Sequence, residues 1–250
     1  MVLEIELLMI NMNLEDFWKS IEENEFHPLN LCFKSRETNS YCKSEIESIN
    51  SNLTCLLNSI TSGSDELIKR LEDKNQFAGA REELEIATHF KRNGFKNVIL
   101  KKSRTSPCSD IELPTKPPIY IEIYLQQYPG KEKKLDKLLA TGESDKKELS
   151  DKEIEVLIYR ALNDKFNQLI KSQDKPVILI LDFGYSESYE RVSQKMLEEI
   201  NLPDFMYCIV VRTKTNLIKI NDSFLNEENV KKTLLSLPIP SYRAGSLYGR

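Results

Sequence analysis

The stretch "SDIELPTKPPIYIEIYLQQ", residues 109–127, decides the fold that this sequence predicts, because its second half has the composition of a buried strand. Over 119–125, side chains alternate between two faces with the period of two that a strand requires. One face carries isoleucine and leucine, and the other carries Tyr120, Glu122 and Tyr124. A buried carboxylate is costly unless it is paired or binds a metal. Glu122 therefore either faces water on a half-exposed strand or holds a ligand.

The regions around this strand predict an α/β fold. Strands are expected at 98–101, 110–113, 119–125, 177–183, 206–212 and 217–220, and helices at 79–92, 151–171 and 189–200. This alternation is typical of a mixed sheet flanked by helices. The first 75 residues instead show helical spacing of apolar residues. We expect a helical N-terminal extension over 1–75, a sheet domain over 76–237 and a flexible C-terminal tail over 238–250.

Composition excludes several classes of protein. The 250 residues are 40% hydrophobic, which is enough for a core. Five scattered cysteines without a Cys-x-x-Cys pair argue against a disulfide framework and a zinc ribbon, and indicate a reducing, cytoplasmic compartment. No apolar run reaches membrane-spanning length, and the apolar N-terminus lacks the basic lead of a signal peptide.

The residues available for catalysis are mainly carboxylates. The eight glycines form no phosphate-binding loop, and the two histidines, His27 and His89, lie far apart in the sequence. With only these two histidines, a serine or cysteine nucleophile activated by an imidazole base is not favoured. If the chain is a hydrolase, carboxylates must do most of the chemistry.

The predicted helix over 79–92 carries an acid on its apolar side. At about 100° per residue, Glu83 lies in the middle of the apolar face, Glu82 lies on its boundary, and Glu85 and Arg92 lie on the water side. The apolar residues around Glu83 are Ala80, Leu84, Ile86, Ala87 and Phe90. Glu83 either pairs with a basic residue at the edge of the core or serves as a ligand, and the spacing leaves both open.

Three carboxylates in the predicted elements suggest a metal site. Glu83 lies on a helix, Asp110 at the start of a strand, and Glu122 in the middle of the next strand. Their hard oxygen atoms suit magnesium or manganese. Such an ion polarises a phosphodiester and lowers the pKa of a bound water. The strand spacing alone is a weak pattern, and the helical glutamate at a core-facing position strengthens it.

The order of these acids resembles the PD-(D/E)XK nuclease superfamily, in which a helix with a glutamate precedes strands with an aspartate and a Glu-x-Lys motif. Residues 79–95, "GAREELEIATHFKRNGF", are similar in layout to the first helix of archaeal Holliday junction resolvases. The resemblance covers roughly 79–125. It implies a restriction-endonuclease-like fold, hydrolysis of phosphodiester bonds in DNA with magnesium or manganese, and catalytic and metal-binding roles for Glu83, Asp110 and Glu122.

The chain departs from the superfamily pattern at two positions. Ser109 replaces the proline before the aspartate, and Tyr124 stands where the lysine belongs. A neutral phenol cannot replace the positive charge with which that lysine stabilises the reacting groups. Members of the superfamily can supply the cation from a neighbouring helix. Lys165 and Gln168, in a segment that resembles that helix, form a Lys-x-x-Gln pair, so Lys165 is expected to supply the charge unless it faces solvent.

The distribution of basic residues bears on nucleic-acid binding. The formal net charge of -4 does not favour it, so a local basic surface is required. Residues 91–104 contain six basic residues and no acid, and are expected either to follow a nucleic-acid backbone or to form a solvated edge. The candidate contacts are Lys91, Arg92, Lys96, Lys101, Lys102 and Arg104.

Three functions remain open at this point. The first is a metal-dependent DNA nuclease. The second is a catalytically inactive nuclease fold that serves as a nucleic-acid-binding or assembly module, which Tyr124 and the acidic balance favour. The third is an α/β regulatory domain whose acids lie on the surface. The expected partner is nucleic acid, with DNA favoured over RNA. No membrane association is expected, and the formation of a homodimer is left open.

Overall fold

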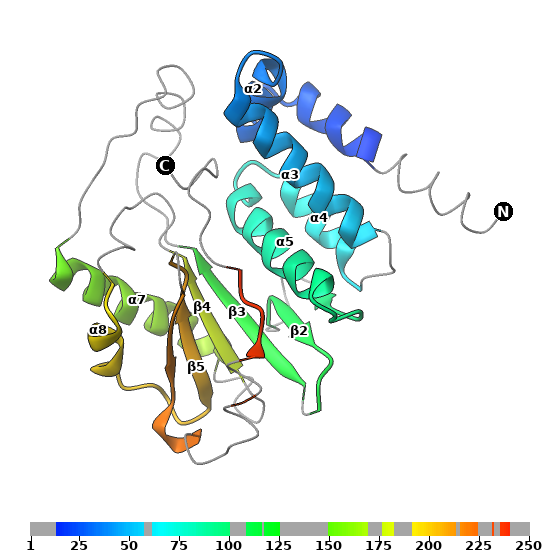
Figure 1. Ribbon diagram of the computed structural model, residues 1–250. Coiled ribbons are helices and arrows are strands. Elements are labelled where there is room, and N and C mark those ends of the chain that lie inside the picture. The colour runs from blue at the N-terminus through cyan, green and yellow to red at the C-terminus, as the bar shows by residue number, and fades with distance from the viewer. Residues whose placement is uncertain are drawn as a thin grey trace.

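The described part of the chain folds into one mixed sheet with helices on both faces (Figure 1). The computed structural model describes residues 14–57, 62–100, 109–116, 118–125, 150–169, 177–182, 192–213, 216–224, 232 and 236–240. The predicted α/β class is confirmed. The charged segment between 130 and 149 lies outside the described residues.

The six strands lie side by side in the order in which they occur along the chain. They are β1 (Ile99–Leu100), β2 (Ile111–Leu113), β3 (Ile119–Leu125), β4 (Val177–Asp182), β5 (Met206–Val211) and β6 (Leu217–Ile220). The central strands β3, β4 and β5 are parallel, and the outer pairs are antiparallel. Every residue of β4 is buried, as expected for a parallel strand covered on both faces.

The helices agree with the predicted pattern except near the N-terminus. Residues 14–23 are helical, and the further helices are α2 (Pro28–Ser35), α3 (Ser40–Leu57), α4 (Ser64–Glu72), α5 (Phe77–Arg92), α7 (Asp151–Leu169) and α8 (Gln194–Glu198). The spacing of apolar residues indicates helices at 14–25, 43–60 and 66–74, and α2 lies between the first two of these segments. Helix α8 is shorter than expected over the part that is described. No helix within the described ranges is long and apolar enough to cross a membrane.

The two faces of β3 pack against different helices, as its alternation predicts. Ile121 and Ile123 belong to a hydrophobic cluster that includes residues of α3, α4 and α5. Tyr120 and Tyr124 pack into a second cluster, which contains residues of α7 and α8. Glu122 alternates with the isoleucines, and therefore lies on the α7 side. The N-terminal helices share one core with the opposite face of the sheet, the face of Ile121 and Ile123.

The turn before α4 joins the N-terminal helices to the sheet. The Leu100 N–H donates to the Ser62 carbonyl at 2.8 Å, which brings this turn against β1. Gly63 has a φ of 88°, and a Cβ atom there would lie 2.5 Å from the Leu100 carbonyl oxygen. Only glycine combines this backbone conformation with so close an approach. The turn therefore fixes where α4 begins relative to the sheet.

His27 caps α2 and makes folding sensitive to pH. Its Nδ1 accepts the Leu29 N–H at 3.1 Å, so Nε2 carries the proton and donates to the Leu71 carbonyl at 2.8 Å. Burial outweighs the opposing effects of the Leu71 carbonyl and the Asp73 charge, and lowers the pKa of His27. Protonation would remove the Nδ1 acceptor.

Lowering the pH should therefore destabilise the protein in a window that begins near pH 6.5, the ordinary histidine pKa. Because the folded-state pKa of His27 is depressed, its contribution to stability is complete above about pH 6.5 and is lost as the pH falls, by about 1.4 kcal/mol per unit of difference between folded and unfolded pKa. Urea unfolding at pH 7.5 and 5.5 measures the effect. His27→Asn keeps a capping oxygen and should show a smaller pH dependence. An equal pH dependence in the variant would contradict this role.

Candidate active site

Asp110 and Glu122 come together where β2 and β3 pair. The antiparallel register joins Ile111 to Ile121, and its continuation by one residue places Asp110 opposite Glu122. Residues directly opposite each other in a sheet point to the same face. Asp110 is 6% exposed and Glu122 is 2% exposed. The Ile123 N–H donates to Asp110 Oδ2 at 2.8 Å, which orients this carboxylate.

Lys165 reaches both carboxylates from α7. Its Nζ donates to Glu122 Oε2 at 3.1 Å and lies 3.5 Å from Asp110 Oδ2. Its side chain is 17% exposed, so the alternative that it faces solvent is wrong. The structure thus brings together two of the predicted carboxylates and the predicted lysine in a largely buried position.

The carboxylates keep Lys165 charged. Burial by itself lowers the pKa of an ammonium group, because it removes water from the charged form. The charges of Asp110 and Glu122 and the hydrogen bond to Glu122 outweigh burial, so the pKa of Lys165 lies above its ordinary value. The charge of Glu83 raises it further, which places the third predicted acid within electrostatic range.

Glu83 is held by Arg70 of α4. Its Oε1 and Oε2 accept hydrogen bonds from Arg70 Nη1 and Nη2, both at 2.5 Å. Of the two interpretations left open for Glu83, pairing with a basic residue is therefore observed. Burial disfavours the charged guanidinium, but the hydrogen bond to Glu83 and the charges of Glu83 and Asp110 outweigh it and raise the pKa of Arg70.

Arg70 was not identified from the sequence, although a signal was present. On α4 the buried residues are Leu67, Arg70 and Leu71, which form one stripe of the helix. An arginine on an apolar stripe requires an acidic partner inside the protein. Glu83, a carboxylate in the middle of an apolar face, is the matching residue.

Tyr124 holds the helix that carries Lys165. Its hydroxyl donates to Asp164 Oδ2 at 3.3 Å. Burial and then the charge of Asp164 raise the pKa of this phenol, so it stays neutral. Tyr124 thus contacts the residue that directly precedes Lys165 on α7.

The described part of the predicted basic run joins α5 to α3. Lys91 Nζ donates to the Leu56 carbonyl at 3.1 Å, and Arg92 Nη2 donates to the Ser51 carbonyl and hydroxyl at 3.1 and 2.9 Å. Lys91 lies eight residues after Glu83, or about 12 Å along the helix.

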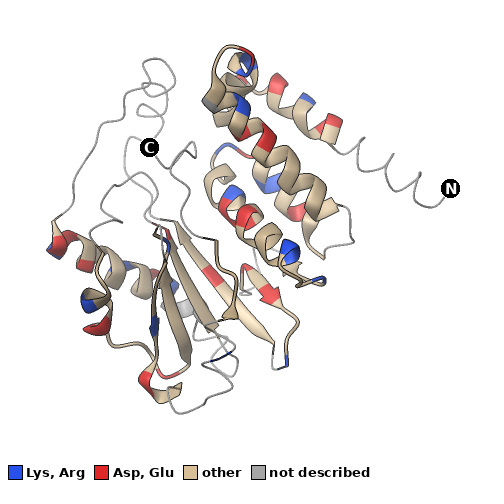
Figure 2. Ribbon diagram, viewed as in Figure 1, with Lys and Arg blue, Asp and Glu red and all other residues tan. Residues whose placement is uncertain are grey.

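Figure 2 shows acidic segments on α5 and β3 and a basic segment at the end of α5. Lys96 is exposed. Lys101, Lys102 and Arg104 lie outside the described residues.

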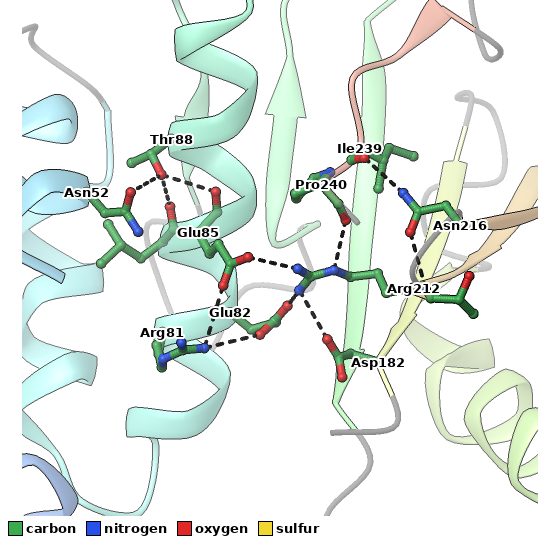
Figure 3. A network of polar contacts seen from close by, with 12 residues as sticks. Asn52, Arg81, Glu82, Glu85, Thr88, Asp182, Arg212, Asn216, Ile239 and Pro240 are labelled. Carbon is green, nitrogen blue, oxygen red and sulfur yellow. Dashed lines mark hydrogen bonds and ion pairs between the residues drawn. The ribbon is translucent and has the colours of Figure 1, made fainter. Parts of the chain in front are cut away.

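A buried arginine at the end of β5 organises a second group of acids (Figure 3). Arg212 is 2% exposed, and its guanidinium lies 3.1 Å from Asp182 Oδ2 and 2.8 Å from Glu85 Oε1. It also contacts Glu82, and its Nε donates to the Pro240 carbonyl at 3.1 Å. The prediction that Glu85 faces water is wrong. The helical wheel places the apolar residues, but it cannot show that a guanidinium from the sheet covers the adjoining polar side.

This network positions α5. Arg81 extends it, with ion pairs of 2.5 Å to Glu45 on α3, 3.8 Å to Glu82 and 3.6 Å to Glu85. Arg212 therefore ties α5 to the ends of β4 and β5, and Arg81 ties α5 to α3. Glu83 lies between the acids that make these contacts, so the network also sets its position.

Two carboxylates of the site suit a hard divalent cation. Among the residues that the structure describes, no group of three or more His, Cys, Asp or Glu side chains is arranged to hold a metal ion. Asp110 and Glu122 nevertheless place two carboxylates around one point, occupied by the Lys165 ammonium. Magnesium is commonly bound by one or two carboxylates, with water and substrate phosphates completing its coordination. Asp110 and Glu122 are therefore suitable protein ligands.

Comparisons of the chain with protein-family models, with curated proteins and with solved structures found no match. The chemistry of Asp110, Glu122 and Lys165 is thus the basis for assigning a function.

Proposed function

We propose that this chain is a metal-dependent, endonuclease-like protein of the PD-(D/E)XK type that hydrolyses phosphodiester bonds in DNA. The observation that carries the proposal is the position of the Lys165 ammonium, 3.1 Å from Glu122 and 3.5 Å from Asp110. Paired carboxylates that can bind a divalent ion, beside a buried cation, suit the hydrolysis of a phosphodiester. The order of β2, β3 and α7 is compatible with a restriction-endonuclease-like fold.

Each residue has a distinct role in this proposal. Asp110 and Glu122 would hold a magnesium or manganese ion, which when bound supplies a Lewis acid and lowers the pKa of a water ligand. Lys165 carries its positive charge to the point where negative charge develops in the transition state. The Ile123 N–H fixes the orientation of Asp110, as hydrogen bonds to metal-binding carboxylates commonly do. Tyr124 anchors Asp164, and so helps to position Lys165.

A second candidate is a catalytically inactive nuclease fold that acts as a nucleic-acid-binding or assembly module. The bidentate ion pair between Arg70 and Glu83 favours it, because this pair already compensates the charge of one predicted metal ligand. Tyr124 at the lysine position and the net charge of -4 point the same way. Cleavage assays separate the two candidates.

Incubation of supercoiled and branched DNA with the protein should give nicked or cut products in magnesium or manganese, and none in EDTA. Asp110→Asn and Glu122→Gln each remove a carboxylate charge and should lower the rate about 100-fold or more, the scale of a lost transition-state stabiliser. Glu112→Gln is the matched control, since Glu112 lies on β2 opposite Tyr120, two residues from Asp110. Its rate should be unchanged.

The pattern of results decides between the candidates. DNA retention without cleavage in any divalent ion would favour the inactive module. Cleavage that persists in both Asp110→Asn and Glu122→Gln would place the active site elsewhere. A protein that neither binds nor cleaves DNA would contradict the nuclease and the DNA-binding form of the inactive module.

A further inference from the structure

Arg70 brings the N-terminal helices into the candidate active site. It lies on α4, and both of its terminal nitrogens bond to Glu83, one to each carboxylate oxygen. A bidentate pair of this kind is among the strongest side-chain contacts. Because the guanidinium compensates its charge, Glu83 in this state is a weaker ligand for a cation. The contact therefore engages both carboxylate oxygens of Glu83, and a divalent ion would have to compete with Arg70 for them.

The charges around the candidate site also show that Arg70 opposes the binding of a divalent ion. Three carboxylates (Glu83, Asp110 and Glu122) and two cations (Arg70 and Lys165) leave one net negative charge among these five groups. The charges of Glu83 and Asp110 both act on Arg70, so the Arg70 charge acts equally on them. Any divalent ion beside Asp110 is therefore repelled by a guanidinium that α4 supplies.

The hydrogen bonding of Arg70 differs from that of the other buried arginine in the neighbourhood. Arg212 donates from Nε to the Pro240 carbonyl, in addition to its contacts with acids. The Nε of Arg70 is buried and has no hydrogen-bond partner among the described residues. A buried donor without a partner is unfavourable, which offsets part of the strength of the pair with Glu83. The Arg70 contact is therefore easier to displace than a fully satisfied one.

We propose that Arg70 is an internal competitor of the divalent ion for Glu83, so that the N-terminal helices set the metal affinity of the site. This proposal rests on the proposed function, because it requires a divalent ion at Asp110 and Glu122. With Arg70 in place, the ion has two protein carboxylates. Without it, Glu83 becomes available as a third ligand, and one repelling charge is removed.

Manganese binding to the full chain without DNA tests this proposal by calorimetry, independently of activity. Arg70→Met removes the charge and keeps most of the side-chain length, and should tighten manganese binding about 10-fold or more. Arg36→Met is the matched control, because Arg36 pairs with the exposed Glu37 and stacks on Phe33. This control should leave the affinity unchanged.

A double variant shows whether the gain passes through Glu83. In a Glu83→Gln background, Arg70→Met should tighten manganese binding less than it does in the wild type. The carboxylate for which Arg70 and the ion compete is then absent. If Arg70→Met does not fold, Arg70→Lys keeps one charge without the bidentate geometry, and should show a smaller gain.

Different results would contradict the competition by Arg70 and the proposed function. Manganese binding to the wild type with equal or weaker binding to a folded Arg70 variant would overturn the competition and leave the proposed function standing. No manganese binding to the wild type or to any variant would overturn the proposed function and the competition together. Binding that appears only when Arg70 is replaced would support the competition in its strongest form.

Discussion

Replacing Arg212 by methionine is expected to lower the free energy of unfolding by about 3–5 kcal/mol, the scale for removing one partner from a buried ion pair. The guanidinium is 2% exposed and lies among Glu82, Glu85 and Asp182. Methionine fills similar space but carries no charge, so these acids lose their shared partner. Urea unfolding followed by circular dichroism at pH 7.5 measures the loss.

A half-exposed arginine provides the matched control for this effect. Arg36→Met, at a half-exposed position, should change stability by no more than about 0.5 kcal/mol. A loss below about 1 kcal/mol in Arg212→Met would show that α5 is held mainly by its apolar contacts.

Replacing Lys165 by alanine is expected to lower the rate of DNA cleavage about 100-fold or more, with little change in DNA binding. The ammonium is the cation that Asp110 and Glu122 share, and their charges keep it protonated. Single-turnover cleavage in magnesium measures the rate, and fluorescence anisotropy in calcium measures binding. Lys165→Arg keeps a charge in the site and should retain part of the activity.

The matched control is Lys152→Ala, an exposed lysine on the same helix. It should cleave at the wild-type rate. Melting curves for both variants show whether the helix remains folded, since Lys165→Ala leaves two buried carboxylates without this cation. A folded Lys165→Ala protein that cleaves at the wild-type rate would show that the metal site alone is sufficient.

The local pattern of the sequence determined the strands and most helices. The period of two over 119–125 assigned the isoleucines to one face of the sheet and Glu122 to the other, because alternate side chains of a strand point to opposite faces. The apolar run over 177–182 indicated a buried strand. Helix α2 was missed although Pro28 at its first turn and His27 as its cap are local start signals.

Parts of the candidate site also followed from the sequence. Asp110 and Glu122 meet because consecutive strands commonly pair, and the register places them opposite each other. The position of Lys165 was expected from the resemblance to a nuclease superfamily rather than from its own spacing. Its contact with Glu122 spans 43 residues, a distance over which periodicity carries no information.

Only the tertiary structure decided which charges pair. The sequence placed Glu83 on an apolar face and left its partner open, and it assigned Glu85 to water. The partners proved to be Arg70, 13 residues before Glu83, and Arg212, 127 residues after Glu85. Hydrophobic periodicity reports which side of an element is buried. Ion pairing depends on the distance between charges and on the water removed around them, and both are set only when helices and strands pack together.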